Sequence, residues 1–216
     1  MKVKVFSRFE RFWHWAQMAL IMALLFTGFG IHGYHQALPF GMQVKVHVFA
    51  AIGLVVLWVF AIFWHLTTGN WRHYLPTTNG LFAVARYYAY GIFKGEDHPY
   101  RKRFWHKHNP LQAASYLGLK LFLFPAIWIS GIAYLTYGFW SSGMAGSSEV
   151  LSWVAIIHTL VAFLIAAFVI IHVYLLTTGH SFREHVSPMI TGYDEVELSE
   201  AEEAYLRQDE PGRIKD

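Results

Sequence analysis

The sequence predicts an all-α integral membrane protein, a bundle of four transmembrane helices, on the basis of its composition and its apolar stretches. Of the 216 residues, 55% are hydrophobic and 14% are charged, whereas soluble domains average about 45–50% apolar and about 25% charged residues. Four apolar stretches reach the roughly 20 residues that cross a hydrocarbon core; they span 12–31, 46–66, 113–137 and 151–177. The first is expected to stay in the protein, because no small-residue cleavage site precedes a polar mature domain.

Basic residues predict the orientation of the bundle, since Lys and Arg are retained on the cytoplasmic side of a membrane. The segment before the first helix and the connection between the second and third helices are both rich in Lys and Arg. The two remaining loops hold only Lys45, at the start of the second helix. Both termini are therefore expected in the cytoplasm, with the chain a multi-pass protein of the bacterial inner membrane.

Two segments outside the predicted spans have a distinct character. In the long connection 67–112, the stretch 81–93 is apolar and tyrosine-rich and has basic flanks, which predicts a helix lying in the membrane interface. From residue 193 onward the chain is acidic and polar, which is typical of a frayed segment. The expected organisation is a four-helix domain over 1–192 followed by an acidic cytoplasmic tail over 193–216.

Cysteine and histidine usage limits the chemistry. The chain has no cysteine and 13 histidines, so disulfides, cysteine-ligated zinc, iron–sulfur clusters, covalently attached c-type haem and thiol nucleophiles are excluded. There is no phosphate-binding glycine loop and no His-Glu-x-x-His run. The basic residues form no clustered face, so no nucleic-acid partner is expected.

Five histidines fall inside the predicted spans, where an ionisable side chain is costly and therefore a candidate for function; four of them match in depth as two pairs. His158 and His172 are 14 residues apart in the fourth helix, which places them on one face and roughly 21 Å apart along its axis. His47 lies at the depth of His158, and His14 at the depth of His172. Two pairs at two depths indicate two metal centres, and a haem iron with two neutral imidazoles would satisfy each pair without a buried charge.

Two further features bear on such centres. Five helical glycines could admit a macrocycle between the helices: Gly28, Gly30, Gly53, Gly118 and Gly131. His65 is 18 residues after His47 and shares its helix face, so it could replace His14 as the inner ligand. His14 is preferred, because His65 lies at or beyond the inner interface, beside Thr67.

The order of these motifs resembles a known family. The chain resembles the di-haem cytochrome b subunits of nickel-iron hydrogenases and formate dehydrogenases. The resemblance rests on the run Arg11-Phe-Trp-His14-Trp, the later Thr27-Gly, His47 at the start of helix two, the His158/His172 pair and the exit to Thr191-Gly. The connection with Asn109-Pro-Leu-Gln112 is most similar to the branch called thiosulfate reductase cytochrome b subunit. The resemblance covers about residues 5 to 193.

The resemblance implies an electron-transfer subunit of a quinone-linked respiratory oxidoreductase. His47 with His158 would hold the outer of two b haems, and His14 with His172 the inner one. Asn109 matches the asparagine that lies beside the quinone in the formate dehydrogenase relatives. The partners implied are quinone in the bilayer and a periplasmic redox subunit, which could be a hydrogenase, a molybdenum enzyme or a multihaem cytochrome c.

Two polar residues near the inner end extend the candidate site. Gln112 could donate a hydrogen bond to a quinone carbonyl. Lys120 lies about two turns inside helix three, where its ammonium either extends to the interface or pairs with an inner haem propionate or a quinone oxygen.

Two other functions compete with electron transfer. Intramembrane histidines also serve transporters of transition-metal ions, although the predicted spans contain no Asp or Glu and show no repeat or broken helix. The third possibility is a haem-bearing anchor that tethers a partner without passing electrons itself.

Overall fold

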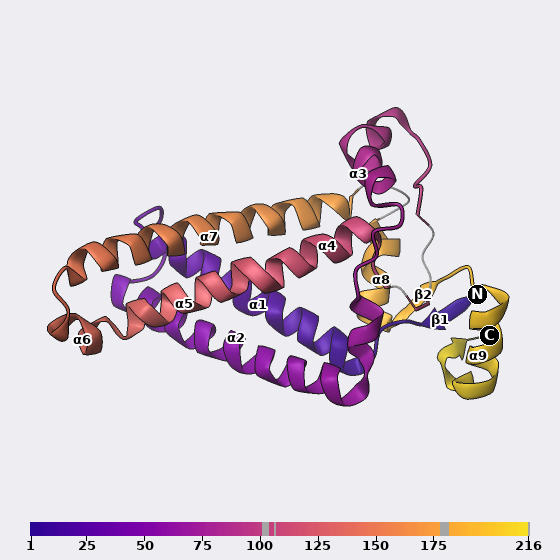
Figure 1. The fold of residues 1–216 in the computed structure, drawn as a ribbon, viewed down its shortest axis with the longest axis horizontal. Coiled ribbons are helices and arrows are strands. Elements are labelled where there is room, and N and C mark those ends of the chain that lie inside the picture. The colour runs from indigo at the N-terminus through magenta and orange to yellow at the C-terminus, as the bar shows by residue number, and fades with distance from the viewer. Residues whose placement is uncertain (101–103, 106, 178–181, 216) are drawn as a thin grey trace.

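Four long helices dominate the computed structural model, which describes residues 1–100, 104–105, 107–177 and 182–215. Within these residues, four helices are long and apolar enough to cross a membrane, as predicted. They are α1 (Arg8–Ile31), α2 (Phe40–Thr68), the composite helix Pro110–Leu135 and α7 (Ser147–Leu175). They lie side by side as an elongated bundle (Figure 1).

The helix starts follow from local sequence. Ser7 caps α1, its hydroxyl accepting from the amide of Glu10 while the Glu10 carboxylate accepts from the amide of Ser7, so two otherwise unpaired donors are satisfied. Pro39 precedes α2. Since these caps lie before the apolar stretches, α1 and α2 begin four and six residues earlier than their predicted spans.

The composite third helix changes its winding in the middle. It comprises α4 (Pro110–Gly118), the π-helical turn η3 (Leu119–Leu123) and α5 (Phe124–Leu135). Pro125 lies at the start of α5, and proline has no amide hydrogen to give to the preceding turn. The wider turn accommodates that missing hydrogen bond, and it carries Lys120.

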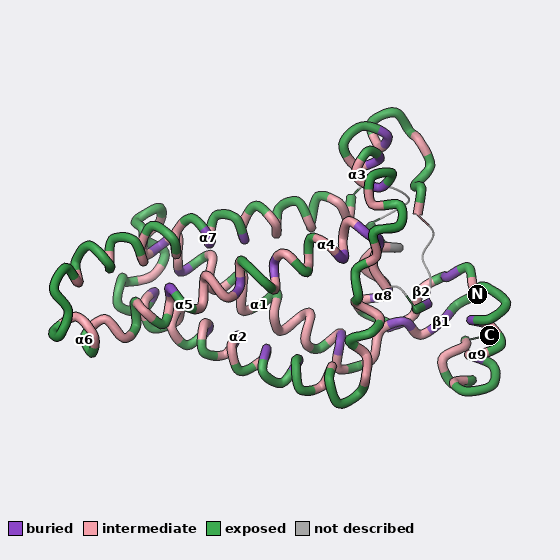
Figure 2. Tube along the Cα trace, viewed as in Figure 1, coloured by how far each residue is buried: buried purple, intermediate pink, exposed green. Residues whose placement is uncertain are grey.

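The bundle core lies between the four long helices. Leu54 and Trp58 of α2 pack with Val161 and Ile165 of α7 and with Phe124. Many other large apolar side chains are exposed, and Figure 2 shows exposed and half-buried residues along most of each long helix. An apolar exterior of this kind matches a lipid environment, in which the hydrocarbon chains cover it.

Short elements connect the long ones. They are η1 (Asn70–Tyr74), α3 (Leu81–Ala89), η2 (Gly91–Lys94), α6 (Tyr137–Trp140), η4 (Ser141–Gly143) and α8 (Phe182–Thr191). The predicted helix in the long connection is present as α3, which projects from the end of the bundle that carries both termini (Figure 1). Its place in a membrane interface stays a prediction.

The acidic tail is folded, so the expectation of a frayed segment is wrong. A three-stranded antiparallel sheet has β1 (Lys2–Lys4) between β2 (Tyr193–Glu195) and β3 (Ile214–Lys215), and α9 (Glu200–Asp209) and η5 (Pro211–Arg213) lie between β2 and β3. Leu206 is fully buried with Val3 and Phe104, and these few apolar residues supply a core that the acidic composition conceals. We call β1, β2, α9, η5 and β3 the cap; it lies at one end of the bundle, the cap end, opposite the far end at α6 (Figure 1).

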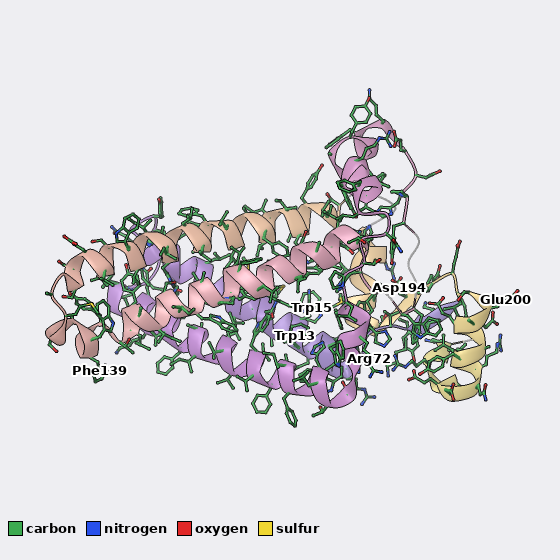
Figure 3. The ribbon with its side chains drawn as sticks, viewed as in Figure 1. Trp13, Trp15, Arg72, Phe139, Asp194 and Glu200 are labelled. Carbon is green, nitrogen blue, oxygen red and sulfur yellow. The ribbon has the colours of Figure 1, made fainter. Side chains whose placement is uncertain are left out.

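The segment before the cap is fastened to α1. The indole nitrogen of Trp15 donates to the carbonyl of Met189 at 2.9 Å, and the Arg11 guanidinium donates to the carbonyl of Ile190. Gly192 follows with φ of +89°, and its carbonyl accepts from the amides of residues 5 and 6. The motif at the start of helix one and the motif after helix four therefore form one junction. Figure 3 shows Trp13 and Trp15 on α1 toward this end and Phe139 at the far end.

Candidate functional site

The structure brings the four intramembrane histidines together as two facing pairs. His47 of α2 and His158 of α7 have ring centroids 6.3 Å apart with an interplanar angle of 61°. His14 of α1 and His172 of α7 have centroids 6.4 Å apart at 54°. We call these the far-end pair and the cap-end pair. Each pair combines one residue of the α1–α2 hairpin with one residue of α7, as the matched depths in the sequence predict.

The two separations suit an ion bound between two imidazoles. A five-membered ring with bonds of about 1.35 Å has a radius of about 1.15 Å, and a metal–imidazole bond is about 2.0–2.1 Å long. Two rings that share one ion therefore have centroids about 6.4 Å apart. The observed values, 6.3 and 6.4 Å, meet this condition at both depths.

Each pair offers only two protein ligands. In the part of the chain that the structure describes, no group of three or more His, Cys, Asp or Glu side chains could hold a metal ion. Structural zinc takes four protein ligands and catalytic zinc three. A haem iron, in contrast, receives its equatorial ligands from the macrocycle and needs only axial ligands from the protein. Two imidazoles without a third protein ligand therefore fit haem better than a bare ion.

Hydroxyl groups support both rings of the far-end pair. Thr27 Oγ1 lies 3.0 Å from Nδ1 of His47, and Ser130 Oγ lies 2.9 Å from Nδ1 of His158. Both hydroxyl residues are buried. Neither was singled out by sequence reasoning as a partner of a ligand; the available signal was a hydroxyl residue followed by glycine in each of two spans.

Two of the five glycines lie at the far-end pair. A Cβ on Gly28 would lie 3.5 Å from Cε1 of His47, and one on Gly131 would lie 3.4 Å from Cε1 of His158. These two glycines lie beside the imidazoles of the far-end pair. A Cβ on Gly30 would collide with the Gln43 side chain, so Gly30 serves the close approach of α1 and α2.

The cap-end pair has different surroundings. Nδ1 of His172 lies 3.4 Å from the hydroxyl of Tyr116, and the His172 ring stacks on Phe168 at 6.1 Å and 10°. Nδ1 of His14 is enclosed by protein atoms without a hydrogen-bond partner, and the ring meets Trp15 edge-on. The nitrogen left for an ion at His14 is therefore Nε2.

His65 is not placed as a member of either pair. Its Nδ1 lies 2.7 Å from the carbonyl oxygen of Ala61, and its ring meets Trp13, Trp64 and Tyr74 edge-on. Nε2 of His65 is fully enclosed by protein atoms, so an ion has no room beside it. The geometry thus favours His14 as the partner of His172.

An apolar and aromatic layer separates the two pairs. Val161 and Ile165 lie on α7 between its two histidines and pack in the core with Trp58. The Trp58 ring contacts Phe124 at 4.9 Å and Trp128 at 5.5 Å. This layer keeps water and charge away from the space between the pairs.

Asn109 and Gln112 cap helix α4. The Asn109 side chain accepts from the amide of Gln112 at 2.8 Å, and Gln112 Oε1 accepts from the amide of Asn109 at 3.2 Å. Asn109 also donates to the hydroxyl of Tyr88 at 3.3 Å. The capping box does not use the side-chain nitrogen Nε2 of Gln112, which can still donate to a ligand.

A cluster of polar residues lies close to the cap-end pair. Nζ of Lys107 donates to Glu10 at 2.5 Å, with their side chains 1% and 3% exposed, and the Tyr74 hydroxyl donates to the same carboxylate. Nζ of Lys120 lies 5.6 Å from the Tyr74 ring and 5.9 Å from the Trp13 ring. Lys120 is therefore directed toward aromatic rings of the cluster. The ion pair was not predicted, because its partners are 97 residues apart.

Burial controls the protonation of the groups around this cluster. Desolvation lowers the pKa of His108 to about 3, with help from Lys120 and Lys107, so His108 is neutral at physiological pH. Desolvation also lowers the pKa of Lys107, although Glu10 opposes that shift. Burial and the Glu10 carboxylate raise the pKa of Tyr74, which therefore keeps its proton.

A four-helix membrane fold with two facing histidine pairs is typical of one class of protein, the multi-pass membrane cytochromes. The chain belongs to the prokaryotic cytochrome b561 family, whose model matches residues 5–192. Cytochrome YdhU of Escherichia coli (strain K12) is 29% identical over 197 residues, which cover 89% of this chain and 74% of that protein. No solved structure matches significantly.

Membership confirms the resemblance, the helical membrane bundle and the assignment of haem b and electron transport to this chain. It also makes the chain a multi-pass bacterial membrane protein. The number of haems, their ligands, the orientation and the partners are proposals.

Proposed function

We propose that this chain is the membrane-anchor subunit of a quinone-linked oxidoreductase and carries electrons between the quinone pool and a periplasmic redox partner through two b haems. His47 and His158 hold one haem, and His14 and His172 hold the other. The observation that supports this most directly is the pair of imidazole separations, 6.3 and 6.4 Å at two depths.

The protein's part in this function is to hold and separate the two haems. When bound, they supply one-electron chemistry. Held by two imidazoles each, the haems would have no position free for a substrate, which would restrict the site to electron transfer. Both pairs use α7, so its helical rise sets their spacing at roughly 21 Å. The layer around Trp58 and Ile165 excludes water between them.

The cap end is proposed as the cytoplasmic side, where quinone reacts. Gln112 there retains an amide donor, and Asn109 beside it is buried. Lys120 places a cation close by, among Trp13 and Tyr74, where it can attract a quinone oxygen or a haem propionate. Electron transfer from this side to the far end would move charge through the bilayer, at about 2.3 kcal/mol per elementary charge per 100 mV.

Haem stoichiometry tests the proposal. The purified chain is expected to show two b haems in a pyridine haemochrome assay and a low-spin α-band. His47→Ala and His14→Ala should each lose one haem, whereas His65→Ala, the matched control, should keep both. A chain with one haem or none, or a His65→Ala variant that loses one, contradicts the ligand assignment.

Reduction by a quinol separates the electron carrier from a passive tether. Menadiol is expected to reduce both haems of the wild-type chain, followed at the α-band. His172→Ala should assemble in the membrane but lose fast reduction by menadiol. Unchanged reduction in that variant would support a tether. No observation favours transport of metal ions.

A further inference from the structure

The hydroxyl groups beside the far-end pair have a defined hydrogen-bond direction. Thr27 Oγ1 lies 2.7 Å from the carbonyl oxygen of Ala23, four residues earlier in α1. Ser130 Oγ lies 2.7 Å from the carbonyl oxygen of Ala126, four residues earlier in α5. A carbonyl oxygen only accepts, and a hydroxyl has a single hydrogen to donate. Each hydroxyl therefore donates to its own helix.

The hydrogen bond that each hydroxyl donates to its own helix determines which atom donates in its contact with the imidazole. Once its hydrogen is committed, the hydroxyl oxygen can only accept from a second partner. The contacts of 3.0 Å to His47 and 2.9 Å to His158 are then hydrogen bonds in which Nδ1 donates. A neutral imidazole that carries its hydrogen on Nδ1 has its lone pair on Nε2. Both rings of this pair are thus held in the tautomer that can bind iron through Nε2.

The cap-end pair lacks this support. Among the described residues, Nδ1 of His14 is enclosed without a partner, and Nδ1 of His172 has a 3.4 Å contact with Tyr116, which is longer than the contacts of 3.0 and 2.9 Å at the far-end pair. A hydrogen bond from the outer nitrogen of a ligating histidine raises its basicity. A more basic ligand stabilises ferric over ferrous iron, so this support acts on one haem and not on the other.

We infer that Thr27 and Ser130 are positioning residues that hold His47 and His158 as Nδ1–H tautomers and selectively lower the reduction potential of the far-end haem. The inference rests on the proposed function, because it takes these histidines as haem ligands. The repeat of one motif on two helices, hydroxyl residue then glycine against a histidine ring, gives the far-end haem matched support from both sides.

Redox titration of the purified chain at the α-band tests this inference. Thr27→Val keeps the side-chain shape and removes the hydroxyl, and Ser130→Ala removes the other one. Each is expected to shift one of two titrating components to a more positive potential and leave the other unchanged. The double variant should shift the same component further. Thr27→Ser and Ser130→Thr keep the hydroxyl and should restore the wild-type potential.

A matched control uses a hydroxyl that meets no imidazole. Thr136 Oγ1 donates to the carbonyl of Ile132 at 2.7 Å, so Thr136→Val removes the same kind of helix hydrogen bond and should move neither component. In the His14→Ala background, the remaining component should still shift with Thr27→Val. In the His47→Ala background, it should not.

The outcomes are distinct. If Thr27→Val loses only the far-end haem while Thr136→Val keeps both haems, the result also supports a positioning role. No shift, a negative shift, or an equal shift of both components would overturn the inference while the haem count still supports the proposed function. If the histidine variants keep the same number of haems as the wild-type chain, the proposed function is refuted instead.

Discussion

Replacing Lys107 with Met tests the most deeply buried ion pair among the described residues. Lys107 and Glu10 are 1% and 3% exposed and 2.5 Å apart, so the substitution leaves a carboxylate buried without its cation. Removing one partner of a buried pair costs about 3–5 kcal/mol. Glu10 keeps the hydrogen bonds from the Tyr74 hydroxyl and the Ser7 amide, which places the expected cost near the lower value, about 3 kcal/mol.

The assay is the thermal midpoint in detergent, followed by tryptophan fluorescence. For a chain of this size 1 kcal/mol shifts the midpoint by about 2–4 °C, so Lys107→Met should lower it by at least about 6 °C. The double variant Glu10→Gln/Lys107→Met leaves no buried charge and should recover most of the loss.

An exposed pair provides the control for that experiment. Arg86 and Glu96 lie 2.8 Å apart but are 64% and 37% exposed, and exposed pairs contribute about 0–1 kcal/mol. Arg86→Met should therefore change the midpoint little. If Lys107→Met lowers it no more than Arg86→Met does, the reasoning from burial is refuted.

Three other predictions follow from single contacts. Gly192→Ala should lower the free energy of unfolding by about 1–3 kcal/mol, because φ of Gly192 is +89° and the new Cβ would lie 2.7 Å from the Phe6 carbonyl oxygen. Gly138→Ala, where the new Cβ would meet open space, is the control in the same thermal assay. Leu206→Ala should cost about 2–5 kcal/mol in the cap, seen as faster proteolysis of the tail at unchanged haem content. The His108 pKa is lowered from 6.5 to about 3, so below pH 6.5 the unfolded chain binds a proton there that the folded chain does not. The free energy of unfolding should therefore fall by up to about 1.4 kcal/mol per pH unit. His108→Leu should make the thermal midpoint less dependent on pH between 7 and 5.

Sequence reasoning predicted the spans and the pairing of the histidines because both depend on regular helix geometry. A span requires apolar length, and the 14-residue interval between His158 and His172 maps directly onto face and depth. Depth in the membrane already favoured His14 over His65. The structure adds that the His14 ring faces His172 with centroids 6.4 Å apart, and that Nε2 of His65 is enclosed by protein atoms.

The remaining features depend on contacts that no local pattern encodes. The cap forms because Leu206 meets Val3 from the opposite end of the chain, and composition alone made this segment look unfolded. Thr27 and Ser130 resemble ordinary helix residues in the sequence. Their relation to histidines 20 and 28 residues away becomes visible only when neighbouring helices are docked.

The distribution of helix irregularities accords with the division of labour proposed for the spans. α7 contributes one histidine to each pair, and residues 159–171 contain neither proline nor glycine, so an uninterrupted α-helix holds the spacing of the two pairs. The composite third helix carries none of the four histidines and is the span that contains Pro125 and the π-helical turn. A change of winding there can direct Lys120 toward Trp13 and Tyr74 without altering either imidazole pair. The four histidines and the π-helical turn that carries Lys120 thus lie on different helices, while α5 still places Ser130 beside His158.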